Sequence, residues 1–146
     1  MSGLRSLAPA VQAALQAAIA PRLPADTQLS LGYPVGGLAD KQVWVVGDFD
    51  STSPWATTGW TQRAEEGTTD VRVAVLLSTN SFTDVQAACM TLAGCVEDAV
   101  AADRTLGGVV DRAEVSAIKG QEAIPEENRR QYGVTLTVSW AGEVVA

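Results

Sequence analysis

Residues 71–104 read VRVAVLLSTNSFTDVQAACMTLAGCVEDAVAADR, and this stretch decides the fold. Its first seven residues carry an apolar side chain at every second position, which predicts a strand with one buried face. The later apolar residues recur at three- and four-residue spacing, which predicts a helix over residues 82–104. Ser81 and Asp84 resemble a capping box at its start, and the Gly-Gly pair at residues 107–108 supplies a stop.

The same two periods recur on both sides of this stretch. Apolar residues spaced by four predict a helix over residues 6–20, which Pro21 and Pro24 end because proline cannot continue the helix ladder. Alternating or β-branched runs predict further strands. These cover residues 29–31, 43–46, 57–65, 109–119 and 132–140. The order along the chain is therefore α-β-β-β-β-α-β-β.

This order predicts an α+β fold, a two-layer sandwich in which two helices cover a mainly antiparallel or mixed sheet of about five to six strands. Glu66-Gly67 is a turn signal, so residues 57–65 and 71–77 are expected to form an extended β-hairpin arm. Residues 48–54 are polar and are expected to form a loop. No internal repeat is present, and residues 1–146 are expected to form one domain.

The composition excludes several classes of function. The 146 residues include no histidine, which excludes serine triads and histidine-ligated metal sites. The formal net charge is −7 and the 10 basic residues are scattered, which argues against a partner that is mainly phosphate backbone. The apolar stretch over residues 4–23 is too short and amphipathic to span a bilayer or act as an export signal, so no membrane partner is expected.

Cys89 and Cys95 lie six residues apart in the predicted helix. Helical geometry separates them by roughly 9 Å, beyond the Cα separation that a disulfide tolerates. We therefore expect both to be reduced, buried packing residues. Without a histidine partner, Cys89 is not expected to act as a nucleophile.

Acidic pairs are the nearest approach to a catalytic or metal-binding motif. Asp48 and Asp50 can share a hard cation such as Mg²⁺, but no third acidic ligand follows at a telling spacing, so a turn is the favoured interpretation. Glu65-Glu66 and Glu126-Glu127 would need one carboxyl group in a desolvated pocket for acid–base work, whereas such neighbours point apart into water. The sequence therefore predicts no enzyme, no cofactor and no metal site.

Tryptophans distinguish the predicted arm from an ordinary surface loop. Trp55 and Trp60 lie in a polar stretch where a local core is hard to build, so they either fold back onto the sheet or form an interface. The interface interpretation makes Trp55, Trp60, Arg63, Glu65 and Glu66 candidate contact residues. Trp44 and Trp140, in contrast, lie on predicted strands and are expected in the core.

Three segments together carry a resemblance to a known family. They are WTQRAEEGTTDVRV at residues 60–73, AADRTLGG at 101–108 and VVDRAEVS at 109–116. With the N-terminal helix and the Gly-Pro connection before the second strand, they resemble the tail terminator (tail completion) proteins of long-tailed phages, particularly those infecting actinobacteria. The resemblance covers most of the chain. Residues 63–73 and 103–116 are its most telling parts.

The resemblance implies a non-enzymatic virion protein of a siphophage type. Such a protein forms a ring, usually a homohexamer, that caps the tail tube, stops its polymerisation and joins the tail to the head connector. The expected partners are further copies of the chain, the tail tube protein and a connector or stopper protein. The expected place is the head-proximal end of the tail, after assembly in the host bacterial cytoplasm. DNA would pass through the ring without sequence-specific binding, and the net charge of −7 motivates the hypothesis of an acidic lumen.

Two alternatives remain at this point. One is another ring-forming protein of the head-to-tail joint, which would bind the portal or connector and not the tube. The other is a small-ligand-binding α+β module that uses the sheet face and the loop at Asp48.

Overall fold

The computed structural model describes residues 6–53, 62–125 and 128–145. Its helices are α1 (Ala8–Ile19) and α2 (Phe82–Ala102), with a short 3₁₀ helix, η1 (Ala20–Arg22), after α1. Its strands are β1 (Gln28–Leu31), β2 (Lys41–Thr52), β3 (Gln62–Leu77), β4 (Arg112–Glu122) and β5 (Arg130–Val145). Both predicted helices are confirmed.

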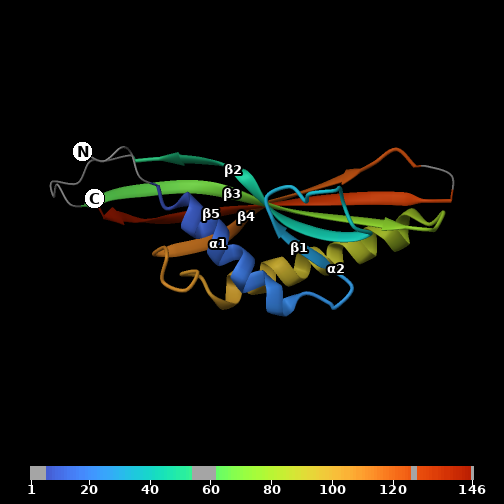
Figure 1. Cartoon of the computed structure of the whole chain (residues 1–146), viewed down its shortest axis with the longest axis horizontal. Coiled ribbons are helices and arrows are strands. Elements are labelled where there is room, and N and C mark those ends of the chain that lie inside the picture. The colour runs from blue at the N-terminus through green and yellow to red at the C-terminus, as the bar shows by residue number, and fades with distance from the viewer. Residues whose placement is uncertain (1–5, 54–61, 126–127, 146) are drawn as a thin grey trace.

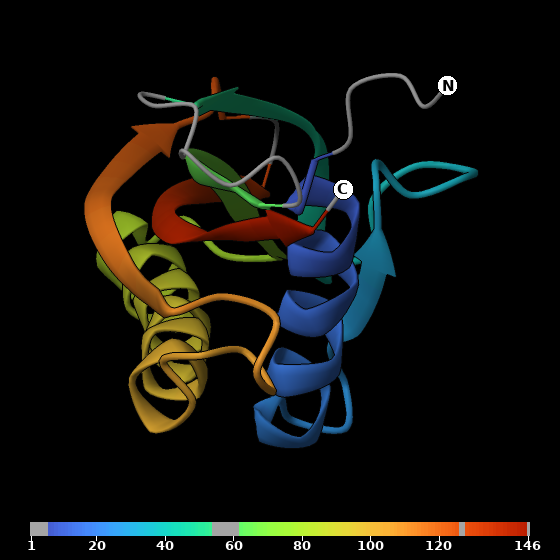
Figure 2. The same cartoon turned by 90° about the vertical axis from the view of Figure 1, so that its left-hand side faces the viewer.

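The strands form one mixed sheet in the order β1-β2-β3-β5-β4 (Figure 1). β1 pairs with β2 in parallel, and every other pair is antiparallel. α2 joins β3 to β4, and β5 lies between these two strands. Both helices lie on the same face of the sheet (Figure 2). The predicted two-layer α+β fold is therefore confirmed.

The hydrophobic core lies between the helices and this face of the sheet. α1 buries Val11, Leu15 and Ile19, which recur every four residues as the sequence predicts. Gln12, which interrupts the apolar pattern, donates from Nε2 to Val46 O at 3.1 Å and Gly47 O at 3.0 Å. These two carbonyl groups lie where the register of β2 against β3 shifts, so the amide side chain satisfies acceptors at an irregular part of the ladder.

α2 begins at the predicted cap. The Ser81 hydroxyl accepts a hydrogen bond from Asp84 N at 3.2 Å. By length and composition alone α2 is apolar enough to cross a bilayer, but it packs seven buried residues into the core, as the central helix of a globular fold does. Cys89 is one of them, and burial raises the pKa of its thiol to about 12. Cys95 is only half-buried, and both cysteines are free.

Two predictions about the arm are wrong. Glu66-Gly67 forms no turn, because β3 is one continuous strand of 16 residues that pairs with β5 along its whole length. Residues 48–52 are no loop, because β2 continues to Thr52 and pairs with residues 66–69 of β3. The hairpin is therefore made by β2 and β3, and the sheet has five strands where six runs were predicted.

The two C-terminal strands form where the sequence predicts them, with displaced ends. β4 begins three residues later than predicted, because the segment after α2 holds Leu106, Gly107 and Gly108 at positive φ values of 49°, 69° and 89°. β5 alternates strictly, with Val134, Leu136, Val138 and Trp140 buried against the helices. Trp140 is thus a core residue, as expected.

Candidate assembly surface

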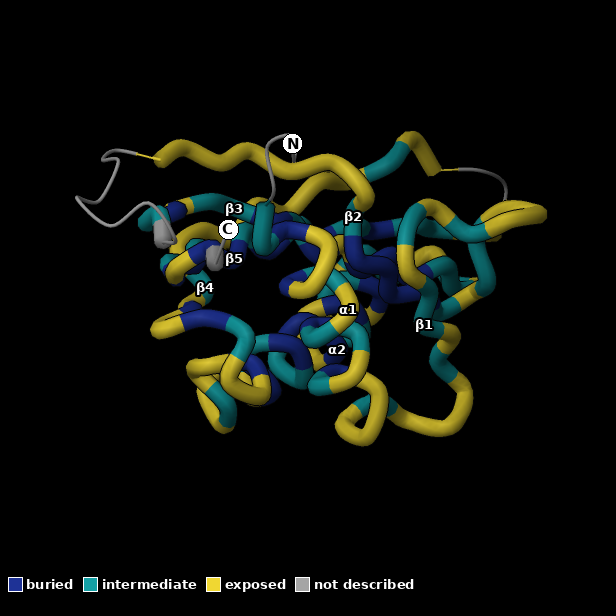
Figure 3. The backbone as a smooth tube through the Cα atoms, turned by 60° about the vertical axis from the view of Figure 1, so that its left-hand side comes forward, coloured by how far each residue is buried: buried dark blue, intermediate teal, exposed yellow. Residues whose placement is uncertain are grey.

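The sheet extends beyond the helix layer at one end. The arm, defined here as residues 48–52 of β2 and 62–67 of β3, runs out past α1 toward the end of the sheet that also carries the C-terminus (Figure 1). All five arm residues of β2 are exposed (Figure 3). β1 pairs only with residues 42–45 of β2, so within the described chain the outer edge of the arm has no strand beside it.

Glu65 lies on the side of this arm that faces α1. It is not solvated, contrary to the prediction from sequence. Its side chain is 2% exposed. Its carboxylate accepts hydrogen bonds from the Ser6 hydroxyl at 2.6 Å and from Leu7 N at 2.7 Å, at the N-terminus of α1. Leu7 is the N-cap residue and its side chain accepts no hydrogen bond, whereas the Ser6 hydroxyl accepts one from Ala8 N at 3.0 Å. A carboxylate from a distant strand therefore satisfies the amide end of the helix and complements its dipole.

The environment of Glu65 stabilises the ionised carboxylate. Burial acts to raise the pKa of Glu65, but hydrogen bonds from Leu7, Ser6 and Ser51, together with the charge of Arg63, act in the other direction. The net effect is a pKa below its ordinary value of 4.5. Glu65 therefore ties the arm to α1 as an anion.

The other candidate contact residues fall into two groups. Glu66 is exposed on the opposite face of β3, and Arg63 is half-buried on the face of Glu65. Trp55 and Trp60 lie outside the described residues, as do Glu126 and Glu127. The structure thus brings Arg63 and Glu65 together and separates them from Glu66.

Trp140 supports the base of the arm. Its indole Nε1 donates to Thr69 Oγ1 at 3.1 Å, and both residues are buried. The indole ring lies against Gly67, where an added Cβ atom would be 2.8 Å from Trp140 Cε2 and 2.7 Å from Asp50 O. Gly67, which the sequence suggested as a turn residue, is therefore required by the close approach of an aromatic ring.

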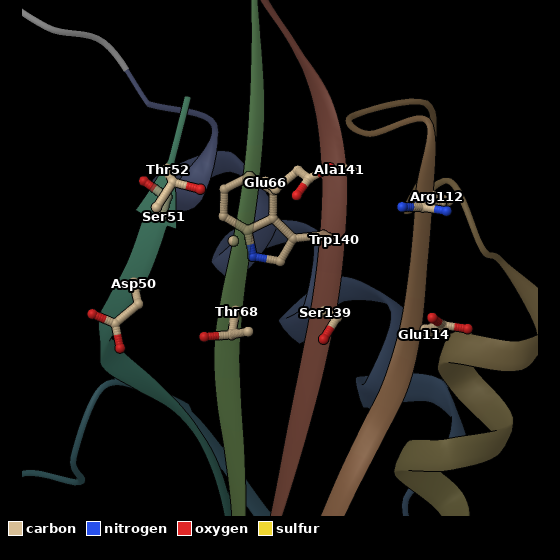
Figure 4. Close-up of a pocket in the computed structure, with 11 residues that line it drawn as sticks. Asp50, Ser51, Thr52, Glu66, Thr68, Arg112, Glu114, Ser139, Trp140 and Ala141 are labelled. Atoms are coloured by element: carbon tan, nitrogen blue, oxygen red, sulfur yellow. The ribbon is translucent and has the colours of Figure 1, made fainter. Parts of the chain in front are cut away.

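A hollow of about 410 Å³ lies beside the arm on the sheet (Figure 4). Asp50, Thr68, Ser139 and Glu114 cross it as one row of paired residues from four strands. Glu66 and Arg112 flank Ala141 in the next row. The hollow is therefore lined by three carboxylates, those of Asp50, Glu66 and Glu114, and by one guanidinium group, that of Arg112.

Asp48 and Asp50 occupy a strand, so the turn interpretation is wrong. They lie near Asp70, whose carboxylate accepts a hydrogen bond from Thr137 Oγ1 at 2.9 Å. Among the described residues, no group of three His, Cys, Asp or Glu side chains is arranged to hold a metal ion.

Trp44 is buried as expected but on the other face of the sheet. It is 7% exposed, it pairs in register with the exposed Arg72, and it makes an edge-to-face contact with Tyr33 at 5.6 Å between ring centroids. The connection between β1 and β2 therefore folds over the open face and covers this indole.

The structural role of Glu65 could not be predicted from the sequence. Its hydrogen-bond partners lie 58 and 59 residues away along the chain, so no local motif marks the contact. The one available signal was the start of α1, where the Leu7 side chain cannot act as a cap and the amide of Leu7 needs an acceptor.

No protein-family model and no curated protein matches the chain. Among solved structures, it is similar to a chain from the virion of a native gene transfer agent (GTA) particle. The TM-score is 0.42 and the sequence identity 19%, over 91% of this chain and 98% of that chain. Similarity at this level carries no argument about function.

Proposed function

We propose that the protein is a virion structural protein, a tail terminator that forms a ring on the head-proximal end of a phage tail tube. The ring, expected to be hexameric, would stop tube polymerisation and present its other face to the connector or stopper protein. DNA would pass through its lumen without sequence-specific binding. The protein would act by shape and contact, without catalysis or a cofactor.

The projecting arm is the observation that carries this proposal. Its β2 residues are exposed and have an unpaired strand edge within the described chain. At the same time its inner side is fixed, because Glu65 binds the start of α1 and Trp140 packs on Gly67. An exposed arm held in one orientation is suited to contact another subunit, and a cyclic assembly requires two different complementary patches.

The sequence resemblance is a second support for the proposal. The family that the segments at residues 60–73 and 101–116 resemble has helices packed on a mixed or antiparallel sheet, and this chain has that fold class. The resembling segments map onto β3, the end of α2 and the start of β4.

Within this proposal the contact residues have different roles. Glu66 is exposed and is a proposed contact with a neighbouring subunit or the tube, as are Trp55, Trp60 and Arg63. Glu65 acts as a positioning residue, because it is buried and its carboxylate is occupied by α1.

A polymerisation assay tests the function. Purified tail tube protein from the same virion is allowed to polymerise with and without the chain, and tube lengths are measured by electron microscopy. We expect a dose-dependent shortening of the tubes with the chain present. Unchanged lengths, together with binding to the purified connector or portal protein, would instead assign the chain to another part of the head-to-tail joint.

A further inference from the structure

The face of the sheet opposite the helices is hollowed into a trough. Its floor is strand β5, between β3 and β4, which presents small side chains on this face over residues 133–141. They are Gly133, Thr135, Thr137, Ser139 and Ala141. Besides the hollow beside the arm, the trough has a second hollow of about 540 Å³ near the connection between β4 and β5. This second hollow and the arm lie toward opposite ends of the sheet.

The second hollow carries two basic side chains that form no ion pair within the described chain. Arg72 and Lys119 flank Thr135 in one row of the sheet, and both are exposed. Of the two acidic residues of the hollow, only Glu122 forms an ion pair. Asp70 accepts a hydrogen bond from Thr137, and Glu122 pairs with Arg130 at 3.1 Å. In a chain with a net charge of −7, this hollow therefore attracts acidic groups.

The arm carries the complementary charge. Asp48 and Asp50 are exposed and form no ion pair within the part of the chain that the structure describes. Asp50 pairs in register with Thr68, four residues from Arg72 along β3, a separation of about 13 Å at the rise of a strand. Asp48 lies nearer, beside Asp70, but no ion pair joins these aspartates to Arg72 or Lys119 within the described residues of one copy.

We propose that the second hollow binds the arm of a second copy of this chain, with Asp48 and Asp50 against Arg72 and Lys119. The small side chains of β5 let the arm approach the floor closely. Because the arm and the hollow are different patches toward opposite ends of the sheet, the contact is head-to-tail, and its repetition closes a ring when the rotation between copies allows. The inference names the self-contact of the proposed ring and so rests on the proposed function.

Charge reversal tests this contact in the full chain. The hollow variant is Arg72→Glu with Lys119→Glu, and the arm variant is Asp48→Lys with Asp50→Lys. All four positions are exposed, and circular dichroism verifies that each variant folds. Native mass spectrometry and sedimentation velocity at low salt measure self-association. We expect the wild type to associate, and each variant alone to associate about tenfold or more weakly, since each then opposes like charges.

Mixing the two variants gives the decisive result. In an equimolar mixture, the lysines of the arm variant meet the glutamates of the hollow variant, and the native arm meets the native hollow, so association should recover. Matched controls are Arg22→Glu with Arg104→Glu and Asp98→Lys with Asp111→Lys, which change the same charges at exposed positions elsewhere and should associate as the wild type does.

Three outcomes would overturn the inference: a wild type that stays monomeric at high concentration and low salt, variants that associate normally, or a mixture of folded variants that does not recover. The tube-shortening assay separates this failure from failure of the proposed function. Charge variants that shorten tubes as well as the wild type leave the function in place and reject the contact. A wild type that leaves tube length unchanged rejects the function itself.

Discussion

Glu65 shows how one residue of the arm determines the position of a helix. Its ionised carboxylate receives two hydrogen bonds at the start of α1, and hydrogen bonds to charged groups stabilise a fold more than those between neutral groups. We predict that Glu65→Gln lowers the free energy of unfolding by about 1–2 kcal/mol at pH 7. Urea denaturation measures this change. Glu66→Gln, at the exposed neighbouring position, is the matched control and should have little effect.

The same contact predicts a pH dependence with a definite sign. The pKa of Glu65 is lower in the folded chain than its ordinary value of 4.5, so the stabilisation is complete above that value and is lost as the pH falls through the folded pKa. The difference in stability between wild type and Glu65→Gln should therefore shrink in acid. A difference that stays constant from pH 7 to pH 3 would contradict the role given to this carboxylate.

Gly67 is the second residue whose role depends on a distant partner. An added methyl group would overlap the Trp140 indole and approach Asp50 O, so the ring or the strand must move. Gly67→Ala is expected to destabilise the chain by about 1–3 kcal/mol, the usual cost of overpacking a buried site. Thermal denaturation compares it with Gly47→Ala, where an added Cβ meets nothing within 4 Å. Equal effects of the two substitutions would reject the explanation.

At the scale of elements, Gln12 connects α1 to the point where β2 leaves the core. Its amide donates to two carbonyl oxygens of β2, whereas no hydrogen bond of the Gln16 side chain is found within the described chain. Gln12→Ala should cost about 0.5–1.5 kcal/mol of stability and should speed amide hydrogen exchange in residues 48–52. Gln16→Ala serves as the control. If both variants exchange alike in this segment, Gln12 does not hold the strand.

The helices were predictable from sequence because each carries its own periodic apolar face and a local start or stop signal. The outer half of β2 could not be predicted from the sequence in this way. Its sequence, with Asp48, Asp50 and Ser51, has the composition of a turn, and it forms a strand because residues 66–69 of β3 supply a ladder for it. For the same reason Gly67 reads as a turn residue until its partner on β5 is known.

At the scale of the whole molecule, the fold class followed from the order of elements, but the candidate surface did not. The sequence located the arm near Arg63 and Glu66 without showing that Glu65 faces inward. The hollow with Arg72 and Lys119 could not be predicted at all, because it combines residues from β3, β4 and β5 that only the strand order brings together.

Electron microscopy of purified tail tubes incubated with the chain tests the central claim most directly. A ring terminator should add density to one end of each tube and none along its sides, because only one end presents the surface that the next tube ring would occupy. Two-dimensional class averages of tube ends would then show a closed ring with a central channel. Bare ends at saturating concentrations of the chain, or binding along the length of the tubes, would contradict the account.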